Sequence, residues 1–133
     1  MKNGEIHDVV IVGGGPAGLS AALLLGRCMR KVVLIDAGRS GLEVGMISPP
    51  GGEPDGCSPS EFLRAGREQL AQFATVTYCQ ADVDDIERNG IHFTAHCSDG
   101  EVFNSRALLL ASEAGAYING HTLYIDGGFL AVT

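Results

Sequence analysis

At 133 residues the chain has the length of one domain, and its 45% hydrophobic content suits a globular fold with a buried core. Its 9 basic and 16 acidic residues give a net charge of −7, which argues against nucleic acid or an anionic membrane as a partner. No signal peptide and no membrane span are expected, because neither pattern occurs in the sequence. The cysteines stand far apart, without CxxC or zinc spacing, and predict isolated thiols in a cytoplasmic protein; they are Cys28, Cys57, Cys79 and Cys97.

The first 36 residues predict a strand, a glycine-rich turn, a helix and a second strand. A continuous Val/Ile run at 8–13 is typical of a parallel strand that is covered on both faces. Small and apolar residues recur at helical spacing over 16–30. A second apolar strand follows at 32–35 and ends at Asp36.

The turn between these elements, residues 13–18, has the spacing of a dinucleotide-binding site and is called the glycine turn below. Gly13 allows the tight turn, Gly15 lets the backbone approach a pyrophosphate, and Gly18 lets the helix lie close to the sheet. The amides and dipole of the following helix would face the phosphates. The Asp36 carboxylate would accept hydrogen bonds from a ribose. The alternative is a glycine-rich turn that binds no ligand.

The middle of the chain predicts a loop, a helix and a strand. Residues 37–58 are rich in glycine and proline and indicate a loop, and Ser58 caps a helix over 59–73. A strand is expected at 75–79. The helix positions that we expect to pack in the core are Phe62, Gly66, Leu70 and Phe73.

Residues 82–105 predict a meander of three short antiparallel strands, because Asn89-Gly90 and Asp99-Gly100 are hairpin turn signals. Residues 106–111 return to the pattern of a buried strand. The acidic residues of the meander suggest a cation site or, as we favour, a solvated sheet edge; they are Asp82, Asp84, Asp85 and Glu87. The histidines are expected at the surface or at strand edges; they are His7, His92, His96 and His121.

This order predicts an α/β, Rossmann-like domain with a parallel sheet and a small antiparallel meander. The chain resembles the N-terminal FAD-binding segment of the pyridine nucleotide–disulfide oxidoreductases, above all the thioredoxin-reductase-like flavoproteins. The matching stretches are 8–22, 32–39, 55–64 and 105–112. The resemblance implies an FAD-binding segment over 1–112.

The resemblance also implies a role for each matching residue. The glycine turn would hold the FAD pyrophosphate, Asp36 the adenosine ribose, and the Val83 backbone the adenine. Glu113 departs from the glycine that the family has beside the flavin. The cofactor-binding residues implied are Gly13, Gly14, Gly15, Pro16, Ala17, Gly18, Asp36, Ala37, Gly38, Arg39, Val83, Ala111, Ser112 and Asp126.

Two parts of the complete family members are missing from this sequence. It contains no second glycine fingerprint for NAD(P)H and no CxxC motif, and no catalytic residue is identified. In complete relatives, the resemblance implies, NAD(P)H binds to such a second domain and donates electrons. We expect either a homodimer or a partner that supplies a nicotinamide domain.

The tail, residues 113–133, resembles the C-terminal end of short-chain dehydrogenases, although their Tyr-x-x-x-Lys motif is absent. We expect 123–126 to form the last parallel strand of the same domain, beside the first strand, with Asp126 at the carboxyl edge of the sheet. Three alternatives stay open: a non-catalytic module that binds FAD or ADP-ribose, an NAD-binding dehydrogenase fragment, and a chimeric fragment without activity.

Overall fold

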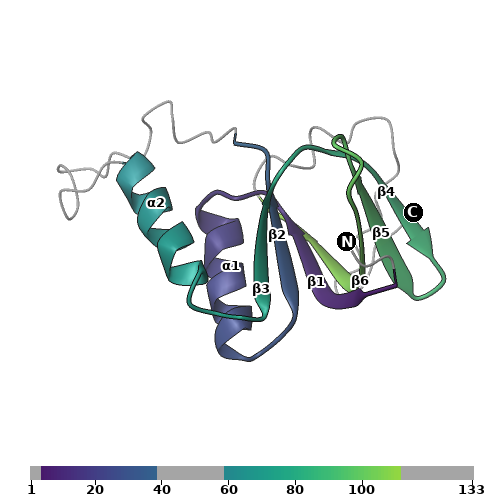
Figure 1. Cartoon of the computed structure of the whole chain (residues 1–133), viewed down its shortest axis with the longest axis horizontal. Coiled ribbons are helices and arrows are strands. Elements are labelled where there is room, and N and C mark those ends of the chain that lie inside the picture. The colour runs from purple at the N-terminus through teal and green to yellow at the C-terminus, as the bar shows by residue number, and fades with distance from the viewer. Residues whose placement is uncertain (1–3, 39–58, 112–133) are drawn as a thin grey trace.

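The computed structural model describes residues 4–38 and 59–111, which form two helices and six strands (Figure 1). Much of the predicted loop and the whole predicted tail strand lie outside these residues. No helix of the described part is long and apolar enough to cross a membrane. The elements are β1 (Ile6–Val12), α1 (Pro16–Arg27), β2 (Val32–Asp36), α2 (Pro59–Leu70), β3 (Val76–Gln80), β4 (Val83–Asn89), β5 (His92–Cys97) and β6 (Val102–Leu110).

The strands form one mixed sheet in the order β3-β2-β1-β6-β5-β4. β1 pairs in parallel with β2 on one side and with β6 on the other, and β2 pairs in parallel with β3. This confirms the predicted α/β fold with a parallel core and an antiparallel meander. Because both edges of β1 are occupied, the predicted vacancy for 123–126 beside the first strand is wrong; that segment itself lies outside the described residues.

β6 is one continuous strand where the sequence predicted two. It pairs antiparallel with β5 near its start, as in Phe93↔Ser105, and parallel with β1 through Val12↔Leu110. No glycine or proline interrupts residues 102–110, so hydrogen bonding continues from the meander into the parallel sheet. The strand therefore ties the two halves of the fold together.

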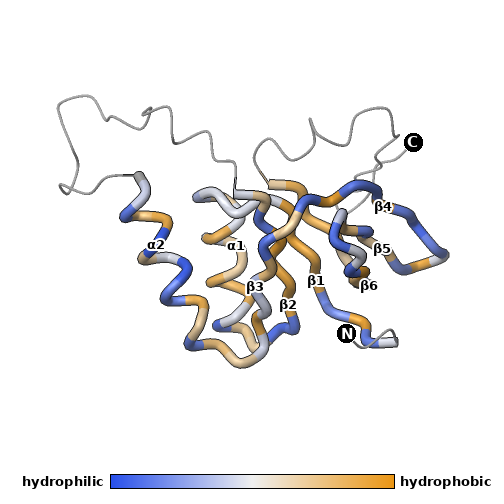
Figure 2. Tube along the Cα trace, turned by 45° about the horizontal axis from the view of Figure 1, so that its top comes forward, coloured by the Kyte–Doolittle hydropathy of each residue, from blue (hydrophilic) through white to orange (hydrophobic). Residues whose placement is uncertain are grey.

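The two faces of the parallel strands are covered differently (Figure 1). Helices α1 and α2 cover one face, and the meander curls over the other. Figure 2 shows the central strands as hydrophobic and much of β4 as hydrophilic, as expected for a covered parallel sheet with a solvated edge strand. The helix-side core contains Ile11, Leu19, Ala22, Val32, Leu34, Leu63, Leu70 and Ala111. The meander-side core contains Val10, Val12, Val33, Ile35, Ala95, Cys97 and Phe103.

The buried face of α2 contains Leu63 in place of the predicted Phe62. Phe62 is 52% exposed, whereas Leu63 is 7% exposed and packs in the helix-side core. Leu70 is buried as predicted, and a Cβ at Gly66 would lie 3.0 Å from a methyl group of Leu19. α2 therefore reaches α1 through a small residue, and the aromatic ring points elsewhere.

α1 ends at Arg27 and not at residue 30 because the chain reverses at Met29. Met29 has a φ of 63°, and its N–H donates to the carbonyl of Gly26 (3.0 Å). The N–H of Arg30 donates to the carbonyl of Leu25 (3.0 Å). These two bonds form a Schellman cap with methionine at the position that usually holds glycine.

The three described cysteines differ from one another in exposure, and His7 differs from its expected exposure. Cys28 is exposed, whereas Cys79 is half-buried and Cys97 is buried. His7 was expected at the surface but is 7% exposed, with its ring edge-on to Phe103. The reason is that β1 begins at Ile6, before the predicted start, so His7 lies inside the sheet and not in front of it.

Candidate functional site

The glycine turn follows β1, the strand at which the strand order reverses. β2 and β3 extend from β1 on one side, and β6 lies on the other. Ligands of open α/β sheets bind at such a switch point, outside the carboxyl ends of the strands. The sheet therefore places residues 13–18 where a ligand would be expected.

Gly13 makes the turn and is held on two sides. Its φ is 117°, and its N–H donates to the carbonyl of Ile35 at 2.9 Å. A Cβ on this residue would strike the carbonyl oxygen of Ala111, whose own N–H donates to the carbonyl of Val12 at 2.8 Å. Glycine is thus required at this position by conformation and by space.

Gly18 and Gly14 are also required by close packing. A Cβ on Gly18 would overlap the carbonyl oxygen of Gly13, so α1 could not lie this close to the turn. A Cβ on Gly14 would overlap the carboxylate of Asp36. The sequence assigned the first role correctly, but it gave no structural reason for Gly14.

Gly15 is different from its neighbours, because the fold does not require it. Its φ is −82°, and a Cβ there would meet nothing within 4 Å. Gly15 occupies the N-cap position of α1 but has no side chain to bond the free amides, and Pro16 is the first helical residue. The amides of the first turn have no partner within a helix, so this end of α1 is open to an anionic ligand.

Asp36 ends β2 and takes part in a polar cluster that the sequence did not predict. Its Oδ1 accepts a hydrogen bond from the N–H of Gly38 (2.9 Å) and its Oδ2 accepts one from the Tyr78 hydroxyl (2.6 Å). Arg67 Nη1 lies 3.9 Å from the same Oδ2. The carboxylate is buried, with 7% of the residue exposed. Burial and the bond to Asp36 raise the pKa of Tyr78 to about 12, so its hydroxyl stays a donor at neutral pH.

The remaining predicted site residues fall into two groups. Ala111 lies against Gly13, and Gly38, with a φ of 86°, lies against Asp36. Val83 starts β4 two residues after Ala81, whose N–H donates to the carbonyl of Asp36 (3.0 Å). Ala17 is exposed and Ala37 is half-buried beside them. Arg39, Ser112 and Asp126 lie outside the described residues.

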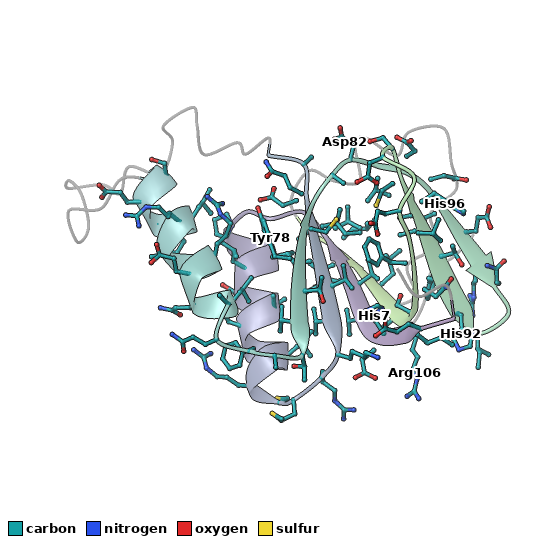
Figure 3. The ribbon with its side chains drawn as sticks, in the orientation of Figure 1. His7, Tyr78, Asp82, His92, His96 and Arg106 are labelled. Atoms are coloured by element: carbon teal, nitrogen blue, oxygen red, sulfur yellow. The ribbon has the colours of Figure 1, made fainter. Side chains whose placement is uncertain are left out.

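The described residues bring together no catalytic set that the sequence missed. His7, His92 and His96 lie apart, as Figure 3 shows. No three His, Cys, Asp or Glu side chains within 4–38 and 59–111 are placed to hold a metal ion. Asp82 instead precedes the edge strand β4, and the other acidic meander residues belong to it, with Asp84 and Glu87 exposed.

A separate hollow of about 720 Å³ extends from the amino-terminal ends of the parallel strands to Tyr78 and Cys79, near the carboxyl end of β3. Lys31, Thr77, Cys79 and Phe103 are among the residues that line it, together with His7. The Nδ1 atom of His7 has no hydrogen-bond partner in the described part of the chain. None of the glycine-turn residues lines the hollow, but Tyr78, whose hydroxyl donates to Asp36, does.

Comparison with known proteins identifies the family. Residues 7–116 match the sequence model of the pyridine nucleotide-disulphide oxidoreductases. The ferredoxin–NADP reductase of Leuconostoc citreum is 29% identical over 119 residues, which are 85% of this chain and 35% of the relative. The thioredoxin reductase of Helicobacter pylori is 28% identical over 109 residues, which are 79% of this chain and 35% of the relative. A thioredoxin reductase structure from Gloeobacter violaceus superposes with a TM-score of 0.70 at 32% identity, over 83% of this chain and 35% of that one.

The chain thus spans about a third of the length of these relatives, 35% in each case. The family match ends at residue 116, and none of the relatives named here is a short-chain dehydrogenase, so the comparisons give no support to the expected origin of the tail. The matched part contains β1, α1 and β2 with the glycine turn, and all of the meander. The chain belongs to the pyridine nucleotide-disulphide oxidoreductase family and corresponds to its FAD-binding segment.

Proposed function

We propose that the chain is the FAD-binding part of a thioredoxin-reductase-like, flavin-dependent NAD(P)H oxidoreductase. The observation that carries this proposal is the contrast within the glycine turn. Gly13, Gly14 and Gly18 are each blocked by neighbouring atoms, whereas Gly15 borders open space. A glycine that the fold does not need, at the N-terminus of a helix at the switch point, is what close approach of a pyrophosphate requires.

The residues present fit the adenosine-diphosphate half of FAD. Main-chain amides from Gly15 onward would hold the pyrophosphate, and Asp36 would face the ribose hydroxyls. Val83 and Arg39 would border the adenosine, while Ala111, Ser112 and Asp126 would lie toward the flavin. When bound, FAD supplies the hydride and electron transfer chemistry, and the protein supplies binding and orientation.

Turnover would need groups beyond those described here. These 133 residues hold no second glycine fingerprint, so NAD(P)H would reach the flavin through a nicotinamide domain outside them, such as one that a partner supplies. A homodimer is the other assembly that we expect. The segment 113–133 would then complete the domain as a tail of short-chain-dehydrogenase type. A cytoplasmic location agrees with the free thiols of the described part, which are Cys28, Cys79 and Cys97.

Two other functions make different predictions. A non-catalytic module would bind FAD, NAD and ADP-ribose with similar affinity, because it would recognise only the half that they share. An NAD-binding dehydrogenase fragment would prefer NAD, and Asp36 suits its free 2′-hydroxyl. Selective binding of FAD over both NAD and ADP-ribose favours the flavoprotein.

The variant Gly15→Ala tests the proposal directly, with Gly4→Ala as its matched control. Neither new methyl group would meet another atom within 4 Å, so both variants are expected to fold. The free energy of unfolding of Gly15→Ala should fall by no more than about 1 kcal/mol, because alanine is a poorer N-cap than glycine. Titration of FAD into each, followed by flavin fluorescence, should show wild-type affinity for Gly4→Ala. For Gly15→Ala we expect affinity at least about tenfold weaker, since the methyl group would displace the pyrophosphate from the backbone.

The result that would contradict the proposal is equal FAD affinity in the wild type and Gly15→Ala. Such a result would mean that FAD binds elsewhere. No FAD binding by the wild-type chain under saturating cofactor would remove the proposal altogether.

A further inference from the structure

The cluster around Asp36 contains two side chains that do not belong to the predicted site. Tyr78 comes from β3 and Arg67 from α2, and both approach the Oδ2 atom of Asp36. Figure 3 shows Tyr78 beside the carboxyl half of the parallel strands. A role for these two residues rests on the proposed function, because both would act through Asp36.

The carboxylate of Asp36 is fixed from three directions. Gly38 bonds to one oxygen and Tyr78 to the other, at 2.9 and 2.6 Å. Gly14 lies so close that a Cβ on it would overlap the carboxylate. A hydrogen bond to an ionised group is about twice as strong as a neutral one, so the Tyr78 bond strongly restricts the χ2 torsion of Asp36.

Fixing the carboxylate matters for recognition of a ribose. A ribose hydroxyl pair needs its acceptor at a defined place, and a side chain that is already ordered loses less entropy when the ligand binds. A carboxylate has about four lone-pair sites, so the two observed bonds leave capacity for the ligand. Tyr78 therefore holds Asp36 without using up its capacity to accept hydrogen bonds.

We propose that Tyr78 is a positioning residue for the ribose: its hydroxyl fixes the Asp36 carboxylate against the glycine turn, with a smaller contribution from Arg67. The hydroxyl acts through Asp36 and not on the ligand. Arg67 contributes less because its guanidinium nitrogen is 3.9 Å away and its side chain is 36% exposed. Tyr78 itself is 37% exposed, so Tyr78→Phe removes the hydroxyl with little change in packing.

The test uses two nucleotides that differ only in the atoms that Asp36 would contact. ADP carries both ribose hydroxyls, and 2′,3′-dideoxy-ADP carries neither. Dissociation constants for both are measured by calorimetry on the wild type, Tyr78→Phe, Asp36→Asn and the double variant. Arg67→Gln is compared with Arg64→Gln, a matched control on the same helix whose arginine pairs with Glu68 at 3.0 Å.

The proposal expects Tyr78→Phe to weaken ADP binding about three- to tenfold while leaving the binding of 2′,3′-dideoxy-ADP unchanged. Adding Tyr78→Phe to Asp36→Asn should cause no further loss, because the hydroxyl acts through the carboxylate. Arg67→Gln should weaken ADP binding by a smaller factor, and Arg64→Gln should not change it.

Several results would overturn the proposal. Equal losses for both nucleotides would show that Tyr78 supports the fold generally. An unchanged or tighter affinity for ADP would show that the hydroxyl is irrelevant or competes with the ribose. Failure of the wild type to bind ADP would refute the proposed function, and this inference with it; that outcome is distinct from wild-type binding that Tyr78→Phe leaves intact.

Discussion

The helix side and the meander side of this molecule both depend on glycine, but for different reasons. Gly13 and Gly18 on the helix side are confined by neighbouring backbone atoms. Gly90 and Gly100 in the meander turns have positive φ values of 66° and 94° but no atom within 4 Å of a built Cβ. The meander therefore needs only the backbone conformation, whereas the glycine turn needs the space as well. Among the described glycines, a built Cβ comes closer than 3.0 Å to another atom only at Gly13, Gly14 and Gly18, beside the carboxyl end of β1 where the proposed site lies.

The largest effect should come from placing a methyl group in the confined region. Gly13→Ala combines a strained φ of 117° with overlap on the Ala111 carbonyl, so we expect a loss of about 3 kcal/mol or more in the free energy of unfolding. Gly90→Ala introduces only the strain of a positive φ, so its free energy of unfolding should fall by about 1 kcal/mol. Urea denaturation followed by circular dichroism measures both. Equal losses of stability in the two variants would show that the glycine turn is no more confined than the meander turns.

An intermediate effect concerns the thiol beneath the meander. Burial, and then the neighbouring Cys79, raise the pKa of Cys97 to about 12. Because the fold favours the neutral thiol, this contribution to stability is complete below the pKa of the unfolded thiol and is lost as the pH rises toward 12. We therefore expect the urea midpoint to fall above about pH 8.5, and to fall less in Cys97→Ala.

The comparison of Cys97→Ala with the wild type has to be made at each pH. Cys97→Ala lowers stability at pH 7 by loss of packing, so the informative quantity is the slope of the midpoint against pH. Cys28→Ala is the control, since this thiol is exposed. Identical slopes for Cys97→Ala and the wild type between pH 8 and 10.5 would contradict the assignment.

The smallest effect should be a gain in stability from replacing Met29, which follows the end of α1. Met29 adopts a φ of 63° and is 74% exposed, so it resembles the meander glycines in conformation and loses few contacts on replacement. Met29→Gly should raise the free energy of unfolding by about 0.5–1 kcal/mol, because glycine adopts the left-handed conformation without strain. Met29→Ala removes the same side chain without this relief and should not stabilise the protein. A thermal unfolding scan of the three proteins decides the point.

Sequence patterns predicted the parts of the fold that local chemistry controls. The Val/Ile runs predicted β1 and β2, and the spacing of Gly13 and Gly18 predicted the turn and the close approach of α1. The continuity of β6 was missed, because apolar alternation in the meander and a buried run in the parallel sheet look like separate strands. Only pairing with β5 and β1 together shows that they are one.

The polar cluster could not be predicted for a similar reason. Tyr78 and Asp36 are 42 positions apart, and the parallel register of β2 and β3 brings them together. An alternating strand pattern places Tyr78 on a face but does not identify its partner. Likewise, the helical spacing that suggested Phe62 could not show that Leu63 faces α1, since the angle of α2 to the sheet is set by tertiary packing.

The central claim is that the glycine turn belongs to an FAD site, and the most direct measurement is the absorption spectrum after incubation with excess FAD and removal of free cofactor. The account predicts a yellow protein with a bound-flavin spectrum, and much less bound flavin in Gly15→Ala than in Gly4→Ala. A colourless wild-type protein after the same treatment would contradict it.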